Sequence, residues 1–139
     1  MSGFVSHYGT TSMLTSLLAR DIAPILTSLW VAATRYVPVA GDSGADIVEP
    51  TAASYSRAAY STGSAYWTIA DSGVLVNAQN ITFPTAVTDW ANCQGWALCT
   101  TATEGMVIAG GRLRRPFLAA AGVQPVMPAG TLQLRVRVG

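Results

Sequence analysis

The sequence predicts a mainly β fold, as a single-domain antiparallel β-sandwich or open barrel with a short N-terminal helix. Short apolar and β-branched segments recur between turn signals from residue 25 onward. Helical spacing of apolar residues occurs once, in residues 12–20. The length of 139 residues suits one domain that buries its core without a metal or a disulfide framework. We therefore divide the chain into an N-terminal arm, residues 1–10, and one β-rich domain, residues 11–139.

The arm and the helix are predicted from composition and spacing. Residues 1–10 are rich in Gly, Ser and Thr, which is typical of an extended arm. Thr10 or Thr11 can cap the helix, and Pro24 ends it at the latest. Its periodic apolar positions are Met13, Leu14, Leu17 and Leu18.

Eight short segments have the composition of strands. They are residues 25–34, 55–60, 66–69, 74–77, 80–83, 95–99, 106–109 and 131–138. The last alternates most clearly, with leucine and valine on one face and Gln133 and two arginines on the other. The stretch TTATEG, residues 100–105, contains Gly105 and predicts a hairpin between residues 95–99 and 106–109. Gly110 and Gly111 predict a turn or a bulge.

Charge is scarce and unevenly distributed. Charged residues make up 11% of the chain, where an ordinary domain has about a quarter, so we expect a partner to cover part of the surface. Residues 1–104 hold three arginines and seven acids, whereas residues 105–139 hold five arginines and no acid. The five are Arg112, Arg114, Arg115, Arg135 and Arg137. This polarity favours docking between complementary surfaces or head-to-tail contact between copies, and we expect no direct binding of nucleic acid.

The residues needed for catalysis or metal binding are mostly missing. The one histidine, His7, lies in the expected arm, so we predict no enzyme, cofactor or metal site. Cys93 and Cys99 are interpreted as core thiols, with a disulfide through a bend at residues 92–95 as the weaker alternative. The acidic loop DSGADIVE, residues 42–49, is interpreted as a solvated turn rather than a calcium site. No apolar run is long enough to cross a bilayer, and we expect no signal peptide or anchor.

Aromatic residues raise the possibility of a sugar-binding platform. The tryptophans are Trp30, Trp67, Trp90 and Trp96. Most lie within strand patterns, which favours core packing over carbohydrate binding. Trp67, after the stretch GSAY, is the best candidate for an exposed ring.

The order of several motifs carries a resemblance. The stretch ITFP is followed by Asp89 and Trp90, then by GWALC, GMVIAGG and RRPF, and finally by PAGTLQL. In this order the chain resembles a family of small virion proteins of tailed bacteriophages, described as tail fibre or capsid decoration proteins. The resemblance covers residues 14–138 and implies a virion structural protein.

This resemblance suggests two functions in the virion, and we also consider one enzymatic function that has less support. The first is a capsid decoration or cement protein that binds the outer head surface, the major capsid protein and neighbouring copies of itself. The alternative is a tail-associated fibre or receptor-binding component that contacts host surface glycans. The distant class is an enzyme acting on polysaccharide. Partner contact is predicted for Arg112, Arg114, Arg115, Arg135, Arg137, His7, Tyr8 and Trp67.

Overall fold

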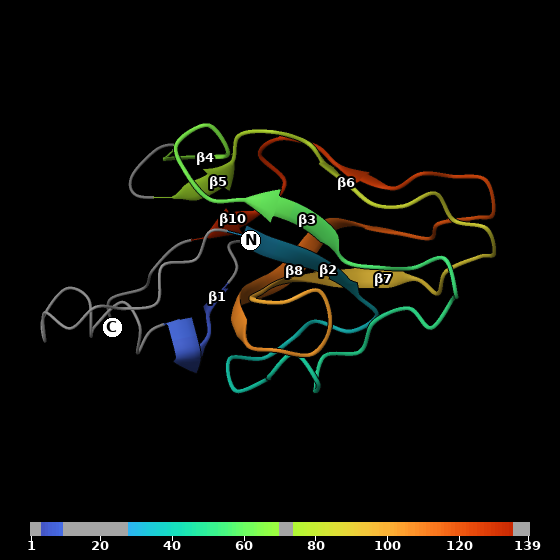
Figure 1. The fold of residues 1–139 in the computed structure, drawn as a ribbon, viewed down its shortest axis with the longest axis horizontal. Helices are drawn as coiled ribbons and strands as arrows, with labels where there is room; N and C mark the ends of the chain where they lie inside the picture. The colour runs from blue at the N-terminus through green and yellow to red at the C-terminus, as the bar shows by residue number, and fades with distance from the viewer. Residues whose placement is uncertain (1–3, 10–27, 70–73, 135–139) are drawn as a thin grey trace, which may run out of the picture.

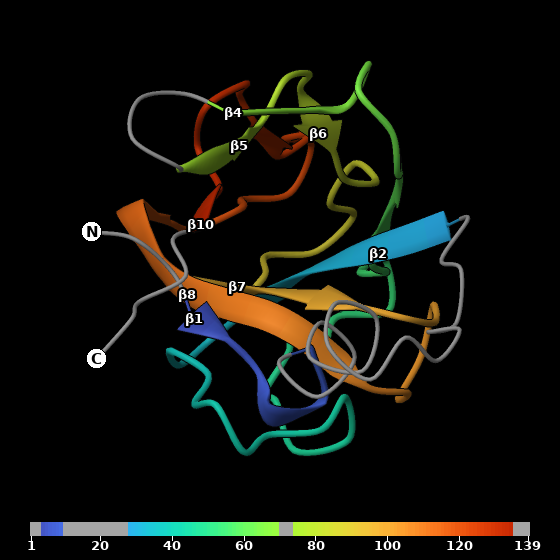
Figure 2. The same ribbon diagram turned by 90° about the vertical axis from the view of Figure 1, so that its left-hand side faces the viewer.

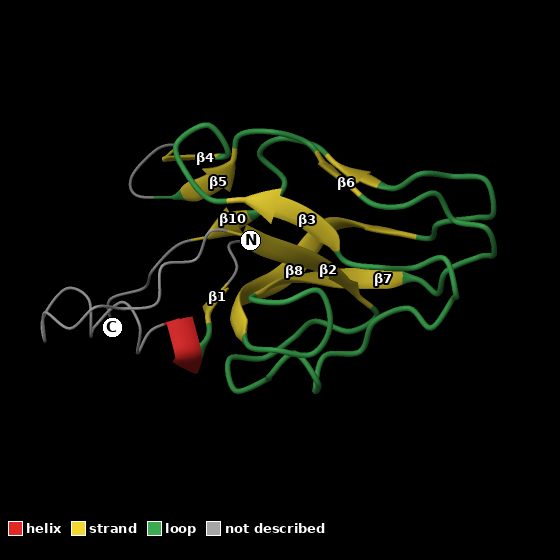
Figure 3. Ribbon diagram, viewed as in Figure 1, coloured by secondary structure: helices red, strands yellow, loops and turns green. Residues whose placement is uncertain are grey.

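The computed structural model describes residues 4–9, 28–69 and 74–134. Within these residues the fold is mainly β, every strand pair is antiparallel and no barrel closes, so the predicted fold class is confirmed. A short helical segment covers residues 7–9 (Figure 3). The helix predicted over residues 12–20 lies outside the described residues.

One layer of the fold is a five-stranded sheet (Figure 1). Its strands in spatial order are β1 (Phe4–Val5), β8 (Val107–Phe117), β7 (Cys93–Cys99), β2 (Ser28–Thr34) and β3 (Ala58–Ser61). β7 and β8 form the predicted hairpin, in which Gly105 turns the chain with a φ of 69°. That backbone conformation favours glycine.

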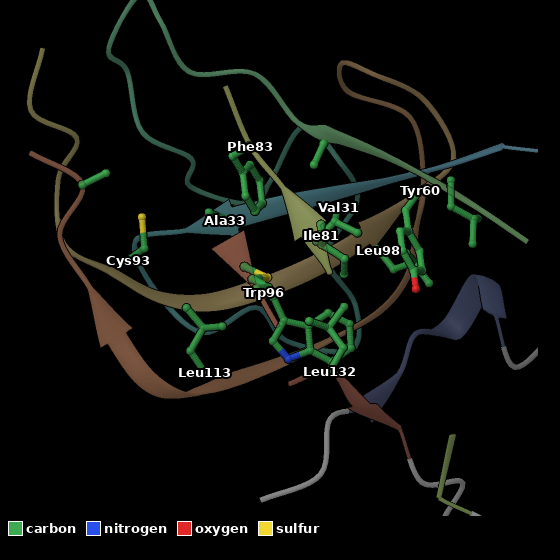
Figure 4. Packing of buried hydrophobic residues seen from close by; sticks show 14 of the residues in the cluster. Val31, Ala33, Tyr60, Ile81, Phe83, Cys93, Trp96, Leu98, Leu113 and Leu132 are labelled. Atoms are coloured by element: carbon green, nitrogen blue, oxygen red, sulfur yellow. The ribbon is translucent and has the colours of Figure 1, made fainter. Parts of the chain in front are cut away.

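The other layer consists of two smaller sheets on one side of the large sheet (Figures 1 and 2). β10 (Gln133–Leu134), β5 (Leu75–Asn77) and β4 (Trp67–Ile69) form one, and β6 (Ile81–Thr82) and β9 (Val126–Met127) form the other. The main core lies between the layers, where Trp96, Phe83 and Leu132 are buried (Figure 4). Leu132 and Leu134 both face this core, as the alternation of their segment predicts.

A second, smaller cluster lies on the opposite face of the large sheet. It contains Ala32, Ile47, Ala97, Cys99 and Val107. Successive residues of a strand point to opposite faces, and both faces of β2 and β7 are covered here. This explains why these two strands are almost continuously apolar.

Several strands differ from their predicted bounds, most clearly β3 and β8. β3 begins at Ala58 rather than Tyr55. Arg57, directly before the strand, donates a hydrogen bond to the Glu49 carboxylate. β8 runs on through Gly110 and Gly111, which pair with Ala97 and Trp96 instead of forming a turn. β9 has no predicted counterpart, since two residues are too few for a visible pattern.

Residues 4–9, expected to be part of an extended arm, lie against the edge of the sheet. Phe4 and Val5 pair with Gly110 and Ala109 of β8. The buried Ser6 hydroxyl donates to the carbonyl of Val107. Gly9 packs so closely that an added Cβ would lie 2.6 Å from the Ile108 carbonyl oxygen. Satisfied backbone groups and this close packing attach the segment to β8.

Candidate interaction surfaces

One candidate surface forms where two loops meet below the large sheet (Figure 1). The N–H of Gly44 donates to the carbonyl of Gly105 at 2.9 Å, which joins residues 41–49 to the hairpin loop of residues 100–105. Asp46 and Glu104 are exposed here, and Asp42 is half-buried. We call Asp42, Asp46 and Glu104 the acidic end.

A single buried guanidinium holds the acidic end together. Arg57 donates through Nε and Nη2 to the Glu49 carboxylate at 2.9 and 3.1 Å. Its Nη1 donates to the carbonyls of Thr101 and Glu104, and Nη2 also donates to that of Gly44. These five bonds match the five N–H donors of an arginine. The side chain therefore links the two loops to the strand that follows it.

Tyr55 completes this buried network. Its hydroxyl donates to Oε1 of Glu49 at 2.7 Å and accepts from the N–H of Ala33. Burial, and secondly the Glu49 charge, raise the pKa of Tyr55 well above its usual value. The phenol is therefore a permanent donor rather than a proton-transfer group.

The second candidate surface forms along the C-terminal half of β8. Between the pairs Gly95 with Arg112 and Cys93 with Phe117, two steps along β7 oppose five along β8, so β8 bulges outward. Arg112, Arg114 and Arg115 are exposed there, and we call these three the basic end. The one ion pair within 4.0 Å in the described part of the chain is Arg57 with Glu49, so the basic end has no carboxylate partner among these residues.

A groove of about 900 Å³ lies beside the basic end. It is lined by residues 113–119 and 123–131, and we call it the basic groove. Leu118, Val123 and Val126 are exposed apolar side chains in its lining. Asp89 lies close to this region, but its carboxylate accepts from the N–H of Ala121 and so fixes the turn after β8.

The two ends lie at opposite ends of β8. Glu104 lies three residues before the start of the strand, and Arg112 to Arg115 lie in its second half. At about 3.3 Å per residue, the six steps from Met106 to Arg112 cover roughly 20 Å. The uneven charge of the sequence therefore corresponds to acidic and basic side chains at opposite ends of β8.

The whole of this region falls within a family match. A family model described as podophage GP4 fiber I protein gp80 matches residues 4–135, from β1 to just beyond β10. The chain belongs to this family. Its description names a phage fibre, so the chain is a bacteriophage virion structural protein, and the predicted resemblance is confirmed. No curated protein matches the chain.

Of the remaining predicted contact residues, the structure describes His7, Tyr8 and Trp67, and none of these three lines the basic groove. His7 is exposed in the helical segment, and its N–H donates to the carbonyl of Ala40. Tyr8 is half-buried. Trp67 is half-buried as well, with Nε1 donating to Ser61 and its ring edge-on to Tyr60 at 5.3 Å. Arg135 and Arg137 lie outside the described residues.

The structure also shows the state of the two cysteines, for which the sequence left a disulfide open. Cys93 and Cys99 are free, and they belong to the clusters on opposite faces of the large sheet. Burial raises the pKa of each thiol to about 11. The described residues contain no group of three or more His, Cys, Asp or Glu placed to hold a metal, and none of their helices could span a membrane.

The acidic loop has the character of a turn. Oδ2 of Asp42 accepts from the N–H of Val39, and Oδ2 of Asp46 accepts from the N–H and hydroxyl of Ser43. The two hydrogen bonds from Ser43 lower the pKa of Asp46. The two carboxylates therefore stabilise the loop that displays them.

Sequence reasoning missed Glu49, Tyr55 and Arg57. Arg57 was assigned to a strand with no partner, and Glu49 to a solvated turn. The contact depends on the path of an irregular loop, which leaves no periodic signal. One clue was available, because a lone arginine between apolar strand residues needs a buried acceptor.

Proposed function

We propose that the chain is a structural subunit of a phage tail fibre and acts through protein contacts rather than catalysis. The observation that carries the proposal is the match to a fibre protein family over residues 4–135. The two charged ends of β8 support it, because a fibre subunit must present more than one contact surface. This was the alternative of the two virion functions that the sequence suggested.

The features of the sequence that suggested the capsid cement function included low charge, polarised arginines and an N-terminal arm. The first two features suit any virion protein in a dense assembly, so they do not favour the head. The third has lost support, since residues 4–9 lie on the sheet. The family description therefore tips the proposal towards the tail.

The buried Trp90 and Trp96 and the packed Trp67 favour the body of the fibre over a glycan-binding tip. Trp90 and Trp96 are each 1% exposed, and Trp67 packs against Tyr60. A ring that stacks on a sugar must present an open face to solvent. We therefore do not include glycan recognition in the proposed function.

The buried ionisable groups favour a structural role over an enzymatic one. Glu49 is held by Arg57 and Tyr55, and the thiols of Cys93 and Cys99 stay protonated at neutral pH. A general base needs a lone pair that is not already engaged in hydrogen bonds, and a nucleophile needs a pKa near the working pH. These groups have neither property.

Immunogold labelling of purified virions tests the proposal. Antibodies raised against the chain should label the tail and leave the head bare. Virions lacking the chain should show no gold and should have fibres that are absent or shortened. Gold over the head surface would overturn the fibre proposal and favour the cement function.

A further inference from the structure

We propose that the acidic end of one copy docks into the basic groove of the next copy. The contact then involves Asp46 and Glu104 on one chain and Arg114 and Arg115 on its neighbour. The inference names the partner of the proposed fibre subunit and in that sense rests on the proposed function. Its physical argument uses charge, shape and exposed apolar side chains.

Charge is the first argument. Among the described residues, no carboxylate lies within 4.0 Å of the exposed arginines of the basic end, and Arg57 is the arginine that forms an ion pair near the acidic end. Arginine forms planar two-bond pairs with carboxylates. Such pairs become available when the acidic end of one chain meets the basic end of another.

Shape is the second argument. The acidic end includes the exposed residues 101–104 of the hairpin loop, which turns at Glu104 and Gly105 with φ values of 49° and 69°. The basic end is hollow, with a groove of about 900 Å³. An exposed loop and a groove of opposite charge can fit together.

Exposed apolar side chains supply the third argument. Next to the acidic end, Val48 and Met106 are each 42% exposed. In the lining of the basic groove, Leu118 is 60% and Val123 48% exposed. Protein interfaces combine an apolar centre with a polar rim, and both ends have these components.

The same features determine the symmetry of the contact. If one end met the identical end of a second copy, like charges would face one another, and this is unfavourable. Acidic end against basic end is a heterologous contact, which closes into a ring or continues as a filament. We therefore infer cyclic or helical association rather than a two-fold dimer.

The buried network lowers the cost of docking. Arg57 fixes the backbone of Gly44, Thr101 and Glu104 before any partner arrives. A loop already held in shape loses less conformational entropy when it binds. The acidic end is thus preorganised to insert.

Charge reversal tests the inference. The basic variant carries Arg114→Glu and Arg115→Glu, and the acidic variant carries Asp46→Arg and Glu104→Arg. In sedimentation velocity at low salt, the native chain should associate with rising concentration, and high salt should weaken this association. Each variant alone should associate at least about tenfold more weakly, because like charges now meet.

The decisive sample is an equimolar mixture of the two variants. One has two acidic ends and the other two basic ends, so the mixture should regain association that neither shows alone. Ser64→Glu with Ala65→Glu, at exposed positions away from both ends, is the control and should associate like the native chain. Native thiols that stay unreactive at neutral pH show that each variant is folded.

Three results would overturn the inference. They are a native chain that stays monomeric, single variants that associate normally, and a mixture that stays monomeric. If the basic groove instead binds an acidic polysaccharide, the basic variant alone would lose that binding and the mixture would stay monomeric. Gold on the head with a restored mixture would refute only the tail location, so the two proposals fail separately.

Discussion

The two ends of β8 carry opposite charge and are built in different ways. At the acidic end, Arg57 and Glu49 form a buried ion pair, and the guanidinium also binds three carbonyls. At the basic end, Arg114 and Arg115 project from a bulge beside a groove and have no carboxylate partner among the described residues. Charge that is paired internally holds the fold, and charge without a partner remains available to another chain.

This difference predicts that equivalent changes will have unequal effects at the two ends. Arg57→Met should destabilise the protein by about 3–5 kcal/mol, because it leaves the half-buried Glu49 carboxylate without its cation and three carbonyls without their donor. Urea unfolding measures the loss. Arg112→Met is the matched control and should change stability by less than about 0.5 kcal/mol, because its side chain is exposed. Equal losses would show that the contrast between the ends is false.

Glycine substitutions sharpen the same comparison. A Cβ at Gly44 would lie 1.8 Å from the carbonyl oxygen of Glu104, so Gly44→Ala should push the two loops of the acidic end apart. We expect a loss of about 1–3 kcal/mol from overpacking. Gly122→Ala, near the basic groove, meets no atom within 4 Å and has only the strain of a φ of 87°. Its thermal unfolding should shift less than that of Gly44→Ala, and the reverse order would contradict the packing.

The two buried thiols predict a loss of stability at alkaline pH. Their pKa in the folded chain is about 11, against an ordinary value of 9.0. A raised folded pKa gives stability that is complete below pH 9 and is lost as the pH rises towards 11. From pH 8 to 10 we expect a loss of roughly 1 kcal/mol per thiol, measured by urea unfolding.

The control for the thiol prediction is a chain with Cys93→Ala and Cys99→Ala. Its stability should fall less over the same pH range, with the remaining fall due to Tyr55, whose folded pKa is also raised. Identical pH profiles for the two chains would rule out the thiols as the cause.

The smallest effect is expected at the basic end. Arg114→Gln with Arg115→Gln should change the free energy of unfolding by less than about 0.5 kcal/mol, since both side chains are exposed. The same variant should weaken association between copies. A large loss of stability would mean that these arginines support the fold rather than a contact.

The sequence predicted the features that depend on local pattern. Leu132 and Leu134 alternate with polar residues and face the core, and the hairpin before β8 follows from its turn residues. The length of β8 was not predictable in this way, because Gly110 and Gly111 resemble a turn. In the structure they pair with Ala97 and Trp96 of β7 and continue the strand.

The candidate surfaces were predictable only in part. Counting charges located the arginines of the basic end, because exposed charge needs no particular tertiary contact. The groove beside them is formed by residues 123–131, and its position depends on how that segment folds back. The Arg57 network depends equally on loop path, so neither spacing nor composition could show it.

Site-specific cross-linking tests the account of two complementary ends most directly. Thr103→Cys lies at the acidic end and Leu118→Cys in the lining of the basic groove, and both native residues are exposed. When the two variants are mixed and oxidised at neutral pH, the account predicts disulfide dimers joining position 103 of one chain to position 118 of another. Dimers that join 103 to 103 or 118 to 118 as readily as 103 to 118 would contradict it.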